Sequence, residues 1–268
     1  MDLDLDGKVA IVTGGGRGIG RGTVEVLARE GVHVAFCSRS LDQLRAVEKE
    51  VTSSGGSCLP VQIDLQEPGA ADELAAQTIS QFGGIDILVC NHGYHQIKEW
   101  DDLTDEDWAT TFEINFFSAM RVCRAVLPRM VEQNSGRIVI VSAGSVYKPS
   151  IVNDEHPHYT AAKAAVANMS KFLSKKFGPH NIIVNTVLPG YGLSPVAIGL
   201  FAKQAEEEGI TPGEYFVKFA KNLNYLPALQ RPGTPEEFGR IIAFLVSGAN
   251  SYLSGVDIQI DGGGLDVP

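Results

Sequence analysis

Basic residues, cysteines and long apolar runs are all scarce in this sequence. The 268 residues contain 22 Lys and Arg against 32 Asp and Glu, which gives a net charge of -10. That sign is wrong for binding phosphate backbones or anionic lipid, which argues against nucleic acid or a membrane surface as a partner. No stretch reaches the roughly 18 uninterrupted apolar residues that a membrane helix needs.

The N-terminus and the cysteines point to the cell interior. The chain begins Met1-Asp2-Leu3-Asp4, which is acidic where a secretion signal needs a basic end. The cysteines show no CxxC or metal-type spacing, and we interpret them as reduced packing residues: Cys37, Cys58, Cys90 and Cys123. We therefore predict a cytoplasmic protein without a metal site.

Short β-branched runs alternate with longer stretches of helical period, which is typical of repeated βαβ units. Nothing marks a second domain, since no internal repeat or shift in composition is present. We predict a single α/β domain over residues 1–268, with a doubly wound, mostly parallel seven-stranded sheet of the Rossmann type. The predicted strands are 8–12, 32–37, 58–63, 85–90, 137–141, 181–187 and 256–260. The predicted helices are 17–29, 41–53, 69–82, one from a Thr104 capping box to 133, 159–177 and 235–247.

Residues 190–235 break this alternation. Their length and their Gly, Pro and aromatic content predict an insertion that covers a ligand site as a mobile substrate lid. Its aromatic residues either line an apolar pocket or anchor the lid, and together they favour a substrate with a hydrophobic part. They are Tyr191, Phe201, Tyr215, Phe216, Phe219 and Tyr225.

A glycine-rich run lies between the first predicted strand and the first helix. It reads Thr13-Gly14-Gly15-Gly16-Arg17-Gly18-Ile19-Gly20, and its spacing differs from the more familiar GxGxxG. In that position a glycine turn lets backbone amides and a helix N-terminus approach a pyrophosphate, so the run predicts a dinucleotide site.

The residues after the second predicted strand bear on which dinucleotide binds. A site for plain NAD usually has an acidic residue there, but this chain has Ser38-Arg39. A guanidinium suits a 2'-phosphate because it stays charged and offers a fork of donors, and Arg17 is a second cation in the loop. NADP is therefore favoured over NAD. In the alternative, Arg39 is a solvated loop charge and Ser38 alone hydrogen-bonds the ribose hydroxyl.

Tyr159 and Lys163 begin the helix after the fifth predicted strand. Residues four apart share a helical face, so the phenol and the ammonium can meet. An unperturbed Tyr has a pKa of about 10, and a nearby cation lowers it toward the working pH for proton transfer. The pair therefore predicts an acid/base centre.

Taken in order, these motifs resemble the short-chain dehydrogenase/reductase family over essentially the whole chain. The glycine run is similar to its cofactor loop, Cys90-Asn91-His92-Gly93 falls where the family shows Asn-Asn-Ala-Gly, and Asn115 matches its helical active-site Asn. Tyr159 and Lys163 match its catalytic pair, Pro189-Gly190 with Ser194 resembles its Pro-Gly-x-x-x-Thr segment, and Asp257 to Gly263 resembles its last strand.

The resemblance implies hydride transfer between a nicotinamide and a carbonyl or secondary alcohol carbon, without metal. Tyr159 would be the general acid in reduction and the base in oxidation, Lys163 would bind the nicotinamide ribose, and Asn115 would hold a relay water. The implied cofactor residues are Gly14, Gly16, Arg17, Gly18, Ile19, Gly20, Ser38, Arg39, Asp64, Leu65, Asn91, Gly93, Tyr159, Lys163, Pro189 and Gly190.

The family's members also commonly form tetramers or dimers through the helices that carry Asn115 and Tyr159, which implies a homo-oligomer. A 3-oxoacyl-type ketoreductase, a sugar or polyol reductase and a steroid-type dehydrogenase all remain open as substrate classes.

The serine that contacts the substrate oxygen in the family is displaced here. Counting along the fifth strand puts that position on Ala143, and counting back from the catalytic tyrosine puts it on Val146. Side chains alternate faces along a strand, so Ser145 stays on the side of Ala143 whereas Ser142 reverses it. We predict Ser145, with Ser142 second and a donor from the loop 153–158 as a further alternative.

Several histidines invite a metal or acid/base role. His92 is interpreted as a loop residue that fills space near the cofactor, and His156 and His158 lack further ligands with metal-type spacing. The polar loop 154–158 precedes the catalytic tyrosine and is expected to help choose the substrate.

The displaced serine and the altered 90–93 loop also motivate an alternative function, an NADP-binding sensor or interaction module with weak or lost turnover.

Overall fold

Seven parallel strands form a single sheet in the part of the chain that the structure describes, a computed structural model covering residues 2–148, 156–190, 195–222 and 226–264. The strand order is β3-β2-β1-β4-β5-β6-β7, and every neighbouring pair runs parallel. The chain reverses its direction of winding between β1 and β4. Ligands of doubly wound sheets bind at that switch point, beyond the carboxyl ends of the strands.

The predicted strands and helices are found within a few residues of their expected bounds. The strands are β1 (Val9–Thr13), β2 (His33–Ser38), β3 (Ser57–Gln62), β4 (Ile87–Cys90), β5 (Gly136–Val141), β6 (Ile182–Pro189) and β7 (Asp257–Ile260). The helices are α1 (Gly18–Arg29), α2 (Leu41–Ser53), α3 (Ala70–Phe82), α4 (Asp105–Phe112), α5 (Ser118–Gln133), α6 (Pro157–Phe177), α7 (Pro195–Glu208), α8 (Pro212–Asn222) and α9 (Pro235–Val246).

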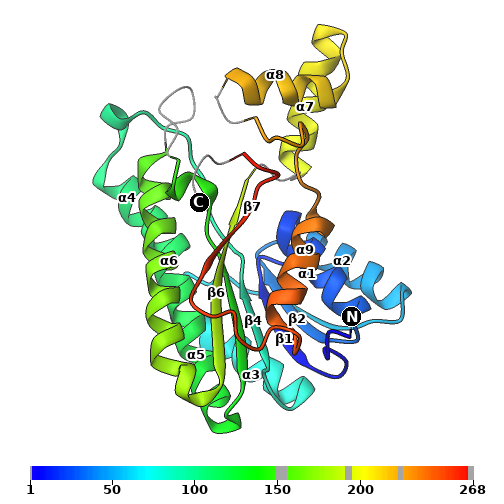
Figure 1. Cartoon of the computed structure of the whole chain (residues 1–268), viewed down its shortest axis with the longest axis vertical. Helices are drawn as coiled ribbons and strands as arrows, with labels where there is room; N and C mark the ends of the chain where they lie inside the picture. Colours follow the sequence, from blue (N-terminus) through cyan, green and yellow to red (C-terminus); the bar gives the residue numbers. More distant parts are fainter. Residues whose placement is uncertain (1, 149–155, 191–194, 223–225, 265–268) are drawn as a thin grey trace.

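Both faces of the sheet are covered by helices, as its nearly continuous apolar strands require. On one face α1, α2 and α9 pack against residues such as Val12, Phe36 and Val139, and on the other α3, α5 and α6 pack against residues such as Ile11 and Ile138 (Figure 1). None of the helices in the described ranges is both long and apolar enough to cross a membrane.

Helix N-termini are fixed by local side-chain caps. The Thr104 capping box predicted from the sequence is present: the Thr104 side chain accepts from the Asp107 amide, and the Asp107 carboxylate accepts from the Thr104 amide. A second box, Thr234 with Glu237, starts α9. These caps fix where α4 and α9 begin.

The helix predicted from Thr104 to residue 133 does extend to Gln133, but it is not α-helical throughout. Residues Glu113–Phe117 form a π-helical turn between α4 and α5, in which the Ser118 amide donates to the Glu113 carbonyl five residues back. A π-turn adds one residue without a visible break in apolar spacing, which is why the sequence pattern does not show it. Such turns occur often at functional sites, and this one carries Asn115.

The insertion at 190–235 contains the helices α7 and α8, which lie beyond one end of the sheet (Figure 1). Phe201 of α7 contacts Tyr215, Phe216 and Phe219 of α8 at ring-centroid distances of 5.9, 5.8 and 5.4 Å. These aromatics therefore join the two helices, which neither alternative from the sequence anticipated. Tyr191 and Tyr225 lie outside the described residues.

Candidate active site

The loop after β1 is shaped by its glycines. A Cβ on Gly20 would come within 2.2 Å of the Gly14 carbonyl oxygen, so only glycine fits there. Gly18 has a φ of +55°, which favours glycine, and within the described ranges a Cβ there would meet nothing inside 4 Å. Arg17, at the capping position of α1, makes no side-chain cap bond. Open space and first-turn amides without a side-chain cap fit a pyrophosphate.

Asn91 holds this loop against β4. Its side-chain amide donates to the carbonyl oxygens of Thr13 and Gly14, each at 3.1 Å, and its backbone amide donates to Thr13 Oγ1 at 3.0 Å. Three bonds from one residue thus fix the glycine loop across the switch point of the sheet.

Ser38 ends β2 and Arg39 follows it, beside the same loop. A Cβ on Gly16 would lie 3.0 Å from Ser38 Oγ, which places the end of β2 next to the glycines. The Arg39 side chain is 69% exposed, and its guanidinium lies 3.8 Å from an Asp64 carboxylate oxygen. Arg17 is exposed as well. Two solvent-accessible guanidinium groups thus lie near the loop, where an additional phosphate could be bound.

Lys163 is a buried cation on α6. Its side chain is 4% exposed, and Nζ donates to the Val141 carbonyl oxygen at 3.1 Å. Burial lowers the pKa of Lys163 to about 8, so the group is still mostly charged at neutral pH. Nζ lies 5.7 Å from the ring centroid of Tyr159, one turn earlier. The helix therefore places the ammonium and the phenol together.

Asn115 lies near the same lysine, across Gly93. A Cβ on Gly93 would be 2.9 Å from Asn115 Oδ1 and 3.2 Å from Lys163 Nζ, so both side chains approach this glycine. Asn115 is 1% exposed; its amide donates to the carbonyls of Tyr94 and Thr111, and Oδ1 accepts from the Tyr94 amide. Asn115, Lys163 and Tyr159 therefore form one connected group.

The two candidate serines have different surroundings. Ser142 is buried, and its hydroxyl donates to the Lys163 carbonyl oxygen at 2.8 Å, which ties β5 to α6. Ser145 lies half-buried on a 3-10 turn, Gly144–Val146, and accepts a 3.3 Å bond from Thr160 Oγ1, beside Tyr159 on α6. Ser145 thus keeps a hydroxyl hydrogen for another acceptor near the phenol, whereas Ser142 does not.

Aromatic contacts bring further side chains to Tyr159. The rings of His95 and His156 meet the Tyr159 ring at 4.9 and 5.5 Å and each other at 4.7 Å, all edge-to-face. Sequence reasoning missed His95, because nothing in the 90–98 loop shows that it folds back over α6. His158 is fully buried, with its ring centroid 6.0 Å from that of Trp108, and burial lowers the pKa of His158.

The remaining predicted residues have the following places. Ile19 lies in the first turn of α1, Leu65 is buried after β3, and Pro189 ends β6. Gly190 donates to the Ile260 carbonyl, and a Cβ there would lie 2.7 Å from Asp261 Cβ. Ser194 and residues 153–155 of the polar loop lie outside the described residues. Where the structure is described, no three metal-ligating side chains gather.

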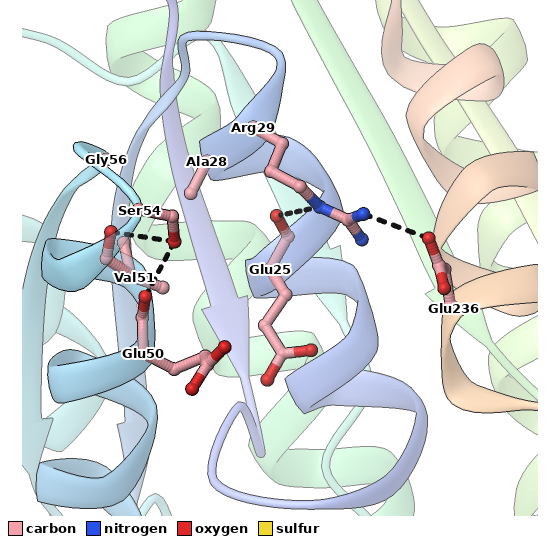
Figure 2. Close-up of a pocket in the computed structure, with 8 residues that line it drawn as sticks. All are labelled: Glu25, Ala28, Arg29, Glu50, Val51, Ser54, Gly56 and Glu236. Atoms are coloured by element: carbon pink, nitrogen blue, oxygen red, sulfur yellow. Dashed lines mark hydrogen bonds and ion pairs between the residues drawn. The ribbon is translucent and has the colours of Figure 1, made fainter.

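A separate pocket of about 320 Å³ lies between α1, α2 and α9 (Figure 2). Arg29 donates there to the Glu25 carbonyl and to Glu236, at 3.2 and 2.9 Å. Arg29 ends α1, about 16 Å from the glycine loop at 1.5 Å per residue. None of the predicted site residues lines this pocket, so its size does not mark it as the reaction site.

The fold and this group of side chains agree with comparisons to known proteins. A family model described as short chain dehydrogenase matches residues 8–205, and the chain belongs to this family of oxidoreductases. The oxidoreductase UcpA of Salmonella typhimurium is 32% identical over 97% of this chain and 95% of its own. The 3-oxoacyl-(acyl-carrier-protein) reductase FabG of Thermotoga maritima is 32% identical over 97% and 99%.

A solved structure extends the likeness to three dimensions. L-sorbose reductase from Gluconobacter frateurii, complexed with NADPH and L-sorbose, superposes with a TM-score of 0.92 and 30% identity over 100% of both chains. The predicted Rossmann-type single domain is confirmed, with an entirely parallel sheet in the described chain. The preference for NADP predicted from Ser38-Arg39 agrees with the cofactor of this neighbour.

Proposed function

We propose that the protein is an NADP(H)-dependent carbonyl reductase or secondary alcohol dehydrogenase that works without metal. The observation that carries the proposal is the connected group of Tyr159, Lys163 and Asn115 beside an open glycine loop. A protein that only binds the dinucleotide has little use for a buried ammonium next to a phenol, so the sensor alternative is not favoured.

The residues around the loop fit the dinucleotide. The glycines and the first turn of α1 would bind the pyrophosphate, Ser38 and Arg39 the 2'-phosphate, and Asp64, Leu65 and Asn91 the adenosine half. Lys163 and the segment after Pro189-Gly190 would hold the nicotinamide half. When bound, the nicotinamide supplies the hydride in reduction or accepts it in oxidation.

Proton transfer is the task of the protein itself. The Tyr159 hydroxyl gives its proton to the substrate oxygen during reduction and takes it back during oxidation. The Lys163 ammonium favours the phenolate form because it places a positive charge in a low-dielectric environment. Asn115 would orient a water that returns the proton, and Ser145 would donate to the substrate oxygen.

The test is NADPH consumption over a panel of ketones that begins with ketohexoses and adds acyl-thioester, aromatic and steroid ketones. We expect turnover on at least one class, and the best substrate defines the subclass. The L-sorbose of the structural neighbour makes ketohexoses the first choice. Tight NADPH binding with no turnover, in either direction, on any member would replace the enzyme proposal with the sensor alternative.

Arg39 is expected to set the cofactor preference. A charge-assisted hydrogen bond contributes about 1.5–3 kcal/mol, so Arg39→Ala should raise the KM for NADPH about 10- to 100-fold and change the KM for NADH less than twofold. Arg45→Ala, at an exposed position of α2, is the matched control. Equal losses with both cofactors would contradict a role on the 2'-phosphate.

Two further parts of the proposal concern the surroundings of the site. We retain the α7–α8 insertion as a lid over the substrate, because it lies beyond one end of the sheet (Figure 1). We also retain a homo-oligomer, a tetramer or dimer, formed through the helices around Asn115 and Tyr159. Phe117 and Phe172 on these segments are 41% and 60% exposed, which suits an apolar interface. That the substrate has a hydrophobic part, as the aromatic residues of the insertion suggest, also remains a prediction.

A further inference from the structure

The π-turn that carries Asn115 contains an unusual hydrogen bond. Since the Ser118 amide donates to Glu113, it does not close the ordinary helical bond to Ile114, four residues back. The Ser118 hydroxyl donates to the Ile114 carbonyl oxygen instead, at 2.5 Å. This side chain thus replaces a backbone donor at the point where the helix departs from α geometry.

His92 connects this turn to the cofactor loop. Its Nε2 lies 2.6 Å from Ser118 Oγ, and its Nδ1 lies 2.7 Å from Thr13 Oγ1, at the end of β1. Ser118 is 26 residues from His92 in the sequence, and Thr13 is 79 residues from it. The alanine that the family pattern shows at this loop position could make neither bond.

The donors and acceptors in this chain of bonds determine the tautomer. The single hydroxyl hydrogen of Ser118 goes to Ile114, so Ser118 Oγ must accept from His92 Nε2–H. Nδ1 is then the acceptor, and the Thr13 hydroxyl donates to it over 2.7 Å in preference to the Val89 carbonyl at 3.4 Å. Every group in the chain has a partner of the correct kind.

The imidazole has to be neutral for this arrangement, because His⁺ offers two donors and no acceptor. Burial, with the positive charge of Lys163 second, lowers the pKa of His92 to about 3. The histidine therefore keeps one donor and one acceptor at neutral pH.

We propose that His92 is a positioning residue, which holds the π-turn in register through Ser118 so that Asn115 stays beside Gly93 and near Lys163. This inference rests on the proposed function for its kinetic consequence. If the turn relaxed to α geometry, the helical register would shift by one residue. The side chains around the turn would then rotate about the helix axis by about 100°, the angle between neighbouring helical residues. Asn115 would then leave the Gly93 backbone and the lysine.

The first experiment compares His92→Phe and Ser118→Ala with wild type. Both should lower kcat 10- to 100-fold, a range typical of misplaced catalytic groups, while the Kd for NADPH changes less than threefold because Asn91 still holds the glycine loop. His92→Gln, which offers a donor and an acceptor, should recover most of kcat. Thr78→Val is the matched control: it removes a buried hydroxyl bonded to the Leu74 carbonyl, far from the site.

The second experiment is a double-mutant cycle for kcat with Asn115→Ala. If His92 acts through Asn115, His92→Phe should lower kcat less than twofold further in the Asn115→Ala background. Full additivity of the two effects would overturn the proposal.

Hydrogen exchange gives a readout that needs no turnover. Amides of residues 112–119 should exchange at least tenfold faster in His92→Phe and Ser118→Ala, but not in Thr78→Val. Unchanged exchange in both variants would overturn the proposal even if the enzyme were active. A wild-type protein that turns over no ketone would refute the proposed function alone, since exchange still decides whether His92 holds the turn.

Discussion

Tyr159→Phe is expected to lower kcat about 10³-fold while changing the Kd for NADPH less than twofold. The substitution removes only the hydroxyl, and general acid–base catalysis contributes about 10²–10⁴-fold. The ring keeps its contacts with His95 and His156, at 4.9 and 5.5 Å, so the surroundings of Lys163 stay in place. Steady-state kinetics on the best ketone, together with NADPH fluorescence titration, measure the two quantities.

Tyr147→Phe provides the matched control. Tyr147 lies 12 residues earlier, exposed directly after the 3-10 turn Gly144–Val146, and its hydroxyl donates to an Asp257 carboxylate oxygen at 2.6 Å. Removing that hydroxyl should leave kcat within twofold. A Tyr159→Phe variant that kept more than a tenth of wild-type kcat would exclude Tyr159 as the proton donor.

Local signals in the sequence were sufficient to predict most of the fold. The alternation of β-branched runs and helical periods predicts the seven strands, and the expected bounds of α2 coincide with the observed ones, Leu41–Ser53. Thr104 and Asp107 predict the start of α4 because a capping box involves only neighbouring residues. The i,i+4 spacing places Tyr159 and Lys163 together for the same reason.

Features that depend on distant partners could not be read in this way. From the sequence His92 is interpreted as a space-filling loop residue. Its partner Thr13 is brought to it by the pairing of β1 with β4, and its partner Ser118 by the packing of α5. The π-turn is hidden for a related reason, since its extra residue leaves the apolar pattern intact. The choice between Ser142 and Ser145 depends on where α6 lies, as the Ser142 bond to Lys163 shows.

Lys163→Met is expected to lower kcat about 100-fold, since an opposite charge beside an acid shifts its pKa by one to three units. Methionine keeps the unbranched shape in the buried site but removes the charge and the bond to the Val141 carbonyl. The same variant should also change how the stability of the apoprotein depends on pH.

The direction of that change follows from the pKa of Lys163, which burial lowers from 10.5 to about 8. Below pH 8 the ammonium is charged in both states, and its burial destabilises the folded protein in full. Between pH 8 and 10.5 the unfolded chain binds more protons than the folded one, so this contribution makes the free energy of unfolding rise with pH. At 1.36 kcal/mol per unit, the rise between pH 8 and 9.5 is about 2 kcal/mol.

Urea unfolding of wild type and Lys163→Met from pH 7 to 9.5 isolates this contribution, because the other titrating groups are common to both proteins. The stability of the variant relative to wild type should fall by about 2 kcal/mol over the upper part of that range. Lys171→Met is the control, since Lys171 also donates to a backbone carbonyl, that of Gly255, but lies exposed on α6. Its curve should run parallel to wild type. A parallel curve for Lys163→Met as well would mean that the lysine pays no burial cost for its charge, and the basis for a tuned phenol–ammonium pair would be lost.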